Sequence, residues 1–324
     1  MGRYALAVTR VLPLVLCLVG GGWTACRPET DERLGLEEKR ASVRIEPAQL
    51  ARGQELERAV ATPAAEVAAR LGAYRLSAVS AMRITAGDRV EAFDESWKLE
   101  VDGKGGSRIT TENSHGYGFE TVAQGKTLYV RPRYGRFARR TAEGDELART
   151  QDGVQGVLAS YLGMLGRFAD RSDQGTTMVA SRKARRIHLS LAASPGPLGD
   201  VEPGQAWRRS LKVSELDGEV AVDEETGAPL HATLEASWTA DRPPPAPAAH
   251  PAAAPAVAPA AARPGIMAVK FSYRADVDQV GLVAAIAAPD GALPSVTRVR
   301  PQLDRQALLE GLVGSAAPVG GGDR

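Results

Sequence analysis

The chain of 324 residues has only two cysteines, Cys17 and Cys26. Beyond residue 26 no cysteine remains, so we expect no internal disulfide and a core that is stabilised by burial. An excess of charge of either sign is also absent, because 40 Lys and Arg residues face 39 Asp and Glu residues. This balance gives the molecule as a whole no electrostatic preference for nucleic acid or for an anionic membrane, and we expect no nucleic-acid partner.

The sequence lacks the common catalytic and cofactor motifs. It has no nucleophile elbow, phosphate loop or dinucleotide fingerprint. Residues 103–107, Gly-Lys-Gly-Gly-Ser, lack the spacing and the following helix of a phosphate loop and are interpreted as a hairpin turn. No two of the four histidines stand at metal-ligand spacing: His115, His188, His231 and His250. We therefore predict no catalytic residue, metal or cofactor, and a protein that is not an enzyme.

Long apolar runs are missing after the N-terminus. Residues 1–10 carry Arg3 and Arg10, residues 11–19 are an apolar run, and three glycines follow. A basic start, a short apolar core and small residues before a cleavage point are typical of a signal peptide. The run is too short to span a bilayer permanently. The sequence predicts a signal peptide over residues 1–25.

Cys26 follows the leader directly, after Trp23-Thr24-Ala25. A cysteine after a small residue resembles the lipobox of bacterial lipoproteins, although Trp23 replaces the usual aliphatic residue. The resemblance implies that Cys26 is acylated and anchors the protein to a membrane of the cell envelope. In enteric-type bacteria, an Asp directly after the acylated cysteine resembles a signal for retention in the inner membrane. Arg27 occupies this position instead, which favours the outer membrane, facing the periplasm. The alternative is an ordinary signal peptide cut near Ala25, which leaves a free thiol.

Residues 26–63 are charged and poor in aromatics at their start, which is typical of a solvated tether. Residues 55–71 can form a helical segment that is interrupted at Pro63. We place a domain boundary between this part and a β domain over residues 64–300.

Alternation of apolar and polar residues begins at Tyr74 and predicts antiparallel strands with one apolar face. The pattern runs through residues 74–84, 97–101, 117–121 and 128–131, and again through residues 187–191 and 211–213. A hairpin is predicted around residues 223–227, and the clearest strand runs over residues 230–238. Its expected partner is residues 269–277. The sequence thus predicts an α+β, mainly β fold, an antiparallel half-barrel sheet that one or two helices cover.

One apolar stripe at helical spacing interrupts the strands between Val154 and Phe168, with Asp152 as the expected N-cap. This helix either covers the open face of the sheet or gates an apolar cavity.

Residues 242–264 consist almost entirely of Pro and Ala, which predicts a disordered or polyproline-like segment. We interpret it as an expanded hairpin loop within one domain, because loop length costs little free energy. Residues 301–324 are expected to form a short helix and a flexible tail.

Two basic clusters have open interpretations. Arginines between Arg131 and Arg140 are interleaved with Tyr134 and Phe137, and a second cluster covers residues 181–186, including Arg182 and Arg186. They either contact anionic lipid headgroups or polysaccharide, or are solvated strand ends.

Two local sequences resemble the LolA/LolB-like lipoprotein carrier superfamily, which includes the mycobacterial LppX/LprG-type lipoproteins. One is Gly125-Lys126-Thr127-Leu128-Tyr129-Val130, followed by Gly135-Arg136-Phe137. The other is the hairpin from Val222 to Leu230. The resemblance covers residues 71–280 and implies an open half-barrel around an apolar cavity for acyl chains. It transfers no binding residue by position, and the Pro/Ala segment departs from the family pattern.

Two functions follow. The first is a lipid-anchored carrier or binding module for a lipid or a lipoprotein acyl chain, and the second is a non-catalytic structural or interaction lipoprotein with a filled core. For the first, we expect large inward residues and the helix to line a ligand cavity. The candidates are Trp97, Tyr117, Phe119, Leu158, Tyr161, Leu165, Trp238, Phe271 and Tyr273.

Overall fold

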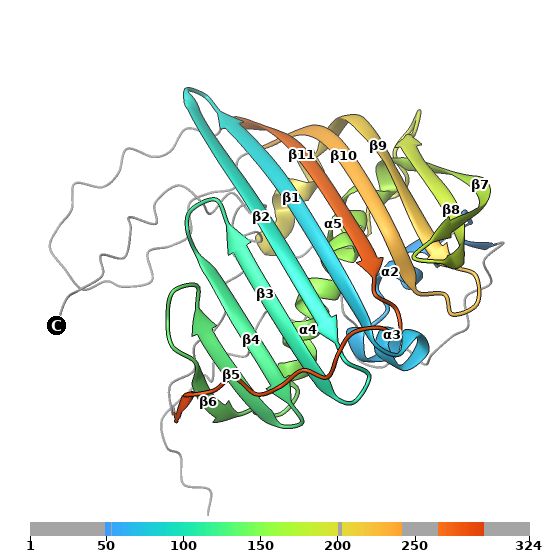
Figure 1. The fold of residues 1–324 in the computed structure, drawn as a ribbon. Helices are drawn as coiled ribbons and strands as arrows, with labels where there is room; N and C mark the ends of the chain where they lie inside the picture. Colours follow the sequence, from blue (N-terminus) through green and yellow to red (C-terminus); the bar gives the residue numbers. More distant parts are fainter. Residues whose placement is uncertain (1–48, 53, 200–202, 242–264, 295–324) are drawn as a thin grey trace, which may run out of the picture.

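The computed structural model describes residues 49–52, 54–199, 203–241 and 265–294, and in this part the chain forms one 12-stranded sheet (Figure 1). The first strands are β1 Tyr74–Ala86, β2 Arg89–Val101, β3 Gly106–Asn113, β4 Gly118–Gln124, β5 Thr127–Pro132 and β6 Ala138–Thr141. The remaining strands are β7 Ala169–Val179, β8 Arg182–Leu191, β9 Lys212–Asp223, β10 Pro229–Asp241, β11 Ile266–Asp278 and β12 Leu293–Pro294.

The strand order is β12-β6-β5-β4-β3-β2-β1-β11-β10-β9-β8-β7. Two meanders, β1 to β6 and β7 to β11, join where β11 pairs with β1. Neighbouring strands are antiparallel, except that β12 runs parallel to β6. The predicted mainly β, open antiparallel fold is confirmed.

The strands on either side of the Pro/Ala segment pair with each other, as the predicted hairpin requires. Residues of β10 and β11 pair in antiparallel register, with Trp238 opposite Val269 and Leu234 opposite Tyr273. Residues 242–264 themselves lie outside the described residues. The two flanking strands therefore belong to one sheet.

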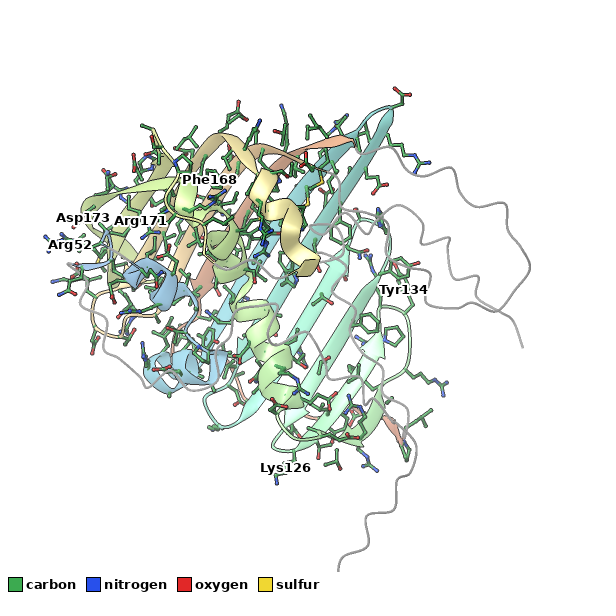
Figure 2. All side chains as sticks on the ribbon, turned by 180° about the vertical axis from the view of Figure 1, so that it is seen from behind. Arg52, Lys126, Tyr134, Phe168, Arg171 and Asp173 are labelled. Atoms are coloured by element: carbon green, nitrogen blue, oxygen red, sulfur yellow. The ribbon has the colours of Figure 1, made fainter. Side chains whose placement is uncertain are left out.

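Alternation places the apolar side chains on one face, here called the inner face, which the helices cover (Figure 2). In β11 every second residue from Met267 to Val277 is buried. The same period appears in β10, β1 and β2, as the sequence predicts. The main hydrophobic core lies between this face and the helices.

Four α-helices of the described residues pack on the inner face: α2 Glu55–Val60, α3 Ala64–Leu71, α4 Glu146–Gln155 and α5 Val157–Leu165. Two 3-10 helices, η2 Gly166–Phe168 and η3 Pro203–Ser210, add to this layer. The break between α2 and α3 falls at Pro63, as predicted, because proline lacks the N–H that a continuous helix needs.

The helix predicted over residues 154–168 begins earlier than expected, and Asp152 is not its N-cap. The chain is already helical from Glu146, and Gly156 separates α4 from α5. The first turns of α4 are mostly polar. The apolar stripe in the sequence therefore begins only at the buried C-terminal end of this helix. Asp152 lies inside α4, and its Oδ1 accepts the backbone N–H of Ala64 at 2.8 Å, at the start of α3.

The main core extends to residues that precede the predicted domain start at residue 64. Leu50, Leu56, Ala59 and Val60 are buried in the main core. The part of the predicted N-terminal segment that precedes Pro63 therefore packs as part of the sheet domain. Residues 1–48, with Cys26, and the predicted tail over residues 301–324 lie outside the described residues.

After β11 the chain crosses the outer face of the sheet, opposite the helices (Figure 1). The Ile286 N–H donates to Asp102 Oδ2 at 3.1 Å, and the Ile286 carbonyl accepts from Gln124 Nε2 at 2.7 Å. Val122 points to this outer face and is nevertheless fully buried. The crossing segment thus covers the part of the outer face formed by β3, β4 and β5.

Candidate functional site

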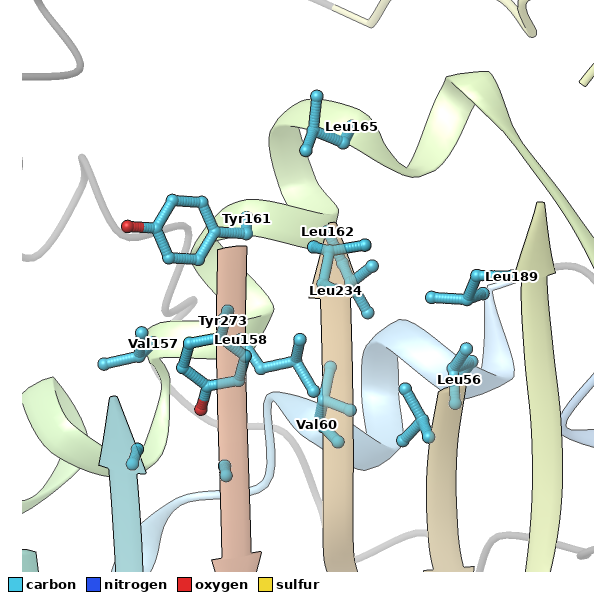
Figure 3. Close-up of a cluster of buried hydrophobic side chains, with 14 of the residues drawn as sticks. Leu56, Val60, Val157, Leu158, Tyr161, Leu162, Leu165, Leu189, Leu234 and Tyr273 are labelled. Atoms are coloured by element: carbon cyan, nitrogen blue, oxygen red, sulfur yellow. The ribbon is translucent and has the colours of Figure 1, made fainter. Parts of the chain in front are cut away.

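Aromatic side chains from one helix and two strands meet in the inner layer. The Tyr161 ring of α5 lies 4.0 Å from the Phe271 ring and 6.1 Å from the Tyr273 ring, measured between ring centroids. The Trp238 ring of β10 lies 6.1 Å from that of Phe271. All four side chains are at most 4% exposed. Figure 3 shows Tyr161 and Tyr273 between α5 and the strands, with leucines of α5 beside them.

The strand register explains why these rings meet. Phe271 stands opposite Ala236 on one side and Met82 on the other, and Tyr273 stands between Leu234 and Ser80. Small residues thus alternate with large ones on the inner face. Ala232, Ala275 and Ala78 form a continuous cross-strand row one step away from the rings. The wall behind the aromatic cluster is therefore lined by methyl groups.

A polar strip borders this apolar wall. Ser80 and Glu95 stand opposite each other on β1 and β2, point inward, and are each 6% exposed. Further along the inner face, Thr111 of β3 and Thr121 of β4 are also buried. The inner face therefore changes from apolar over β10 and β11 to partly polar over β2 to β4.

Two buried tryptophans have indole N–H groups without a hydrogen-bond acceptor among the described residues. Nε1 of Trp238 and Nε1 of Trp207 are both inaccessible to water. Trp207 belongs to η3, which packs against β10, so both indoles lie in the inner layer. A buried indole N–H normally finds an acceptor, and leaving one unpaired costs about 1–3 kcal/mol.

The structure brings seven of the nine predicted cavity residues into the main core: Trp97, Leu158, Tyr161, Leu165, Trp238, Phe271 and Tyr273. Phe119 instead packs against a separate small cluster of Ala123, Leu128 and Val130. Tyr117 is a correction, because it is 56% exposed. It keeps the inward parity of β4 but stands in the turn before that strand.

Sequence reasoning missed Ser80, Glu95 and Trp207 as parts of the inner layer. Ser80 falls between Ala78 and Met82 on the same parity, so the alternation already pointed it inward. Glu95 follows in the same way from Trp97. Trp207 lies in a short basic segment with neither strand nor helix periodicity, and no signal in the sequence indicates its burial.

The basic clusters are largely neutralised. Arg131 binds Glu120, Arg140 binds Glu146, and Arg133 Nη2 lies 3.3 Å from Glu112 Oε2. In the second cluster Arg182 binds Asp223 and Arg185 binds Asp173. Most of these guanidinium groups are thus held by a carboxylate of the same sheet.

Each histidine within the described ranges contacts a residue of the sheet. His231 Nδ1 lies 2.7 Å from Asp276 Oδ1, and His188 Nδ1 lies 3.0 Å from the Gly218 carbonyl oxygen. The His115 ring packs edge-on against Phe93. In the part of the chain that the structure describes, no group of His, Cys, Asp or Glu could hold a metal ion, and no helix is long and apolar enough to cross a membrane.

A groove of about 740 Å³ lies on the outer face, across β2, β1, β11, β10 and β9. Arg83 and Lys270 are cross-strand neighbours in it, and Asp94 and Glu235 line it as well. The groove therefore presents charges of both signs beside apolar side chains such as Met82 and Leu216. Of the predicted cavity residues, only Phe271 contributes to its lining within the described chain.

No family model matches the chain, and no curated protein matches it. The search of solved structures returns lipoproteins and members of the LolA superfamily. LprF from Mycobacterium bovis is 10% identical, with a TM-score of 0.27, over 74% of this chain and 98% of that one. The Mycobacterium tuberculosis lipoprotein LppX is 13% identical, with a TM-score of 0.26, over 71% and 99%.

A LolA superfamily protein from Nitrosomonas europaea is 11% identical, with a TM-score of 0.19, over 71% of this chain and 96% of that one. These identities and TM-scores are low.

Proposed function

We propose that the protein is a binding module that holds an apolar ligand with a polar end, such as a lipid or an acyl chain, between the inner face and α5. The observation that carries the proposal is the pair of buried indole N–H groups of Trp238 and Trp207 without an acceptor among the described residues. A ligand oxygen would satisfy such a donor. Pockets of this kind combine an apolar lining with a few placed polar groups.

The surrounding side chains support an amphipathic ligand. The Tyr161, Phe271 and Tyr273 rings and the row of alanines suit an acyl chain. Ser80 and Glu95 suit its polar end at the border of the apolar wall.

The test is native mass spectrometry of the full-length protein after gentle extraction, with two matched variants. Ala232→Phe adds a ring to the inner face, and Ala268→Phe adds the same ring to the exposed face of β11. We expect a lipid mass on the wild type and on Ala268→Phe, and its loss from Ala232→Phe. Repeated absence of any lipid from the wild type would overturn the proposal.

The second candidate is a structural or interaction protein with a filled core. It is favoured by the burial of the seven predicted residues, of which none is more than 4% exposed. In a filled core, the ring of Ala232→Phe costs about 1–3 kcal/mol by overpacking. Thermal unfolding of wild type and variants that have all been stripped of lipid therefore separates the candidates, since a ring that enters an empty ligand space costs less than one that overpacks a filled core.

We further propose that Cys26 carries an acyl anchor and that the protein faces the periplasm from the outer membrane of a bacterial envelope. Support comes from the leader and from Ala25 before the cysteine. A fatty-acid analogue should label the wild type and Cys17→Ser but not Cys26→Ser. Continued labelling of Cys26→Ser would contradict the proposed acyl anchor at Cys26.

A further inference from the structure

The strand ends of β4 and β5 carry two exposed tyrosines beside two exposed arginines. Tyr134 is 87% exposed and Tyr117 is 56% exposed. Arg133 and Arg136 are exposed in the same turn. We call Tyr117, Arg133, Tyr134 and Arg136 the tyrosine–arginine rim.

The fold brings the rim together from two turns. Phe119 pairs with Pro132, so the chain before β4 and the chain after β5 leave the sheet at the same end. The Arg133 N–H donates to the Gly118 carbonyl at 2.8 Å and fixes the two turns side by side. Figure 2 shows Tyr134 beyond the helices, far from Lys126 at the opposite end of these strands.

Local charge at the rim differs from the balance of the whole chain. Residues 131–139 contain four Arg side chains and no acidic side chain. Glu120 binds Arg131, and Glu112 of β3 lies 3.3 Å from Arg133. Arg136 and Arg139 form no ion pair with any residue that the structure describes. The rim is therefore net positive.

The aromatic rings and the cations are arranged for an interface between apolar and aqueous phases. The Arg133 guanidinium carbon lies 5.4 Å from the Tyr134 ring centroid, and that of Arg131 lies 4.5 Å from the Phe137 ring centroid. Tyrosine places an apolar ring and a polar hydroxyl at the headgroup level of a bilayer. Arginine adds attraction to anionic headgroups.

We infer that the tyrosine–arginine rim docks on the surface of a bilayer that contains anionic phospholipid. Charge complementarity selects the anionic lipid, and the two exposed rings select a bilayer over a soluble polyanion. The inference does not depend on a ligand in the inner layer, so a negative lipid analysis of that layer leaves it untouched.

The test uses co-sedimentation of the full-length chain with vesicles of phosphatidylcholine alone or mixed with phosphatidylglycerol. All proteins carry Cys26→Ser, so that no acyl group contributes and the leader contributes equally. Arg133→Gln/Arg136→Gln removes two rim charges, and Lys104→Gln/Lys126→Gln removes two charges at the opposite strand ends. We expect the rim variant to lose about thirtyfold in partitioning to mixed vesicles, and the control variant to match the parent.

Added salt should weaken binding of the parent but have little further effect on the rim variant. Tyr117→Ser/Tyr134→Ser should lose binding as well. Hydrogen exchange should show vesicle-dependent protection in residues 113–118 and 131–137. Equal partitioning of the rim and control variants, protection elsewhere, or equally tight binding of a soluble anionic polysaccharide would overturn the inference.

Discussion

At the scale of single residues, the turn between β7 and β8 stores backbone strain. Ala180 and Ser181 have φ of 50° and 63°, in the left-handed region that costs residues with a Cβ about 1–2 kcal/mol each. Two-residue hairpin turns of this shape prefer Asn-Gly. We expect Ala180→Asn/Ser181→Gly to raise the free energy of unfolding by about 1 kcal/mol in chemical denaturation. Ser272→Gly, in the extended backbone of β11, should lower it instead.

The buried Asp223 carboxylate makes the stability of the fold depend on pH. Its side chain is 1% exposed and accepts hydrogen bonds from the Thr226 N–H at 2.7 Å and the Thr226 hydroxyl at 2.9 Å, and it binds Arg182. Burial raises the pKa of this carboxyl, but the Arg182 and Thr226 hydrogen bonds outweigh it and hold the pKa below its usual 3.8.

A pKa that is lowered in the folded state stabilises the fold above the unfolded value and loses this effect as the pH falls through the folded value. Asp223→Asn should therefore lower stability by about 2 kcal/mol at pH 7. The loss should shrink between about pH 5 and the lowered pKa. Urea unfolding at several pH values measures it, and a loss that does not change with pH would contradict the assignment.

At the scale of elements, Asp152 shows a contact that no local pattern reveals. It lies in α4, yet its carboxylate accepts the first N–H of α3 at 2.8 Å. Losing such a bond costs about 0.5–2 kcal/mol. We expect Asp152→Ala to lower the free energy of unfolding by about 1 kcal/mol and Asp152→Asn to lower it less. Asp145 stands at the N-cap of α4 without a side-chain capping bond, so Asp145→Ala should have less effect than Asp152→Ala.

Strands were predictable here because their signal is local. Every second residue of β10 and β11 is apolar, and the sheet buries those residues. The start of α4 was not predictable, since its first turns are mostly polar and carry no apolar stripe. The position of Tyr117 was missed for a related reason. Parity tells which way a side chain points, whereas the extent of the covering helices decides whether it is buried.

At the scale of the whole molecule, the site depends on long-range pairing. Tyr161 meets Phe271 only because β11 returns to pair with β1, after residues that carry no helix or strand signal. The inward direction of these aromatic side chains could be predicted from the sequence. The burial of Trp207 could not, because it follows from the packing of η3 on β10.

A ligand in this layer should contribute to the stability of the entire domain. Ligand at one hundred times its dissociation constant stabilises a folded protein by about 2.7 kcal/mol. For a domain of this size, each kcal/mol shifts the melting temperature by about 2–4 °C. We therefore expect protein that is unfolded in guanidinium, stripped of lipid and refolded to melt about 5–10 °C below protein as purified, and added phospholipid to restore the difference.

Ala232→Phe is the matched control for this measurement, because its ring occupies the space that the lipid would take beside Ala275. Its melting temperature should be the same before and after stripping, and added phospholipid should not raise it. If the wild type also melts at one temperature in all three states, the inner layer is a filled core and Trp238 keeps an unpaired N–H at a cost to the fold. A shift in the wild type that Ala232→Phe shares would place the lipid elsewhere on the molecule.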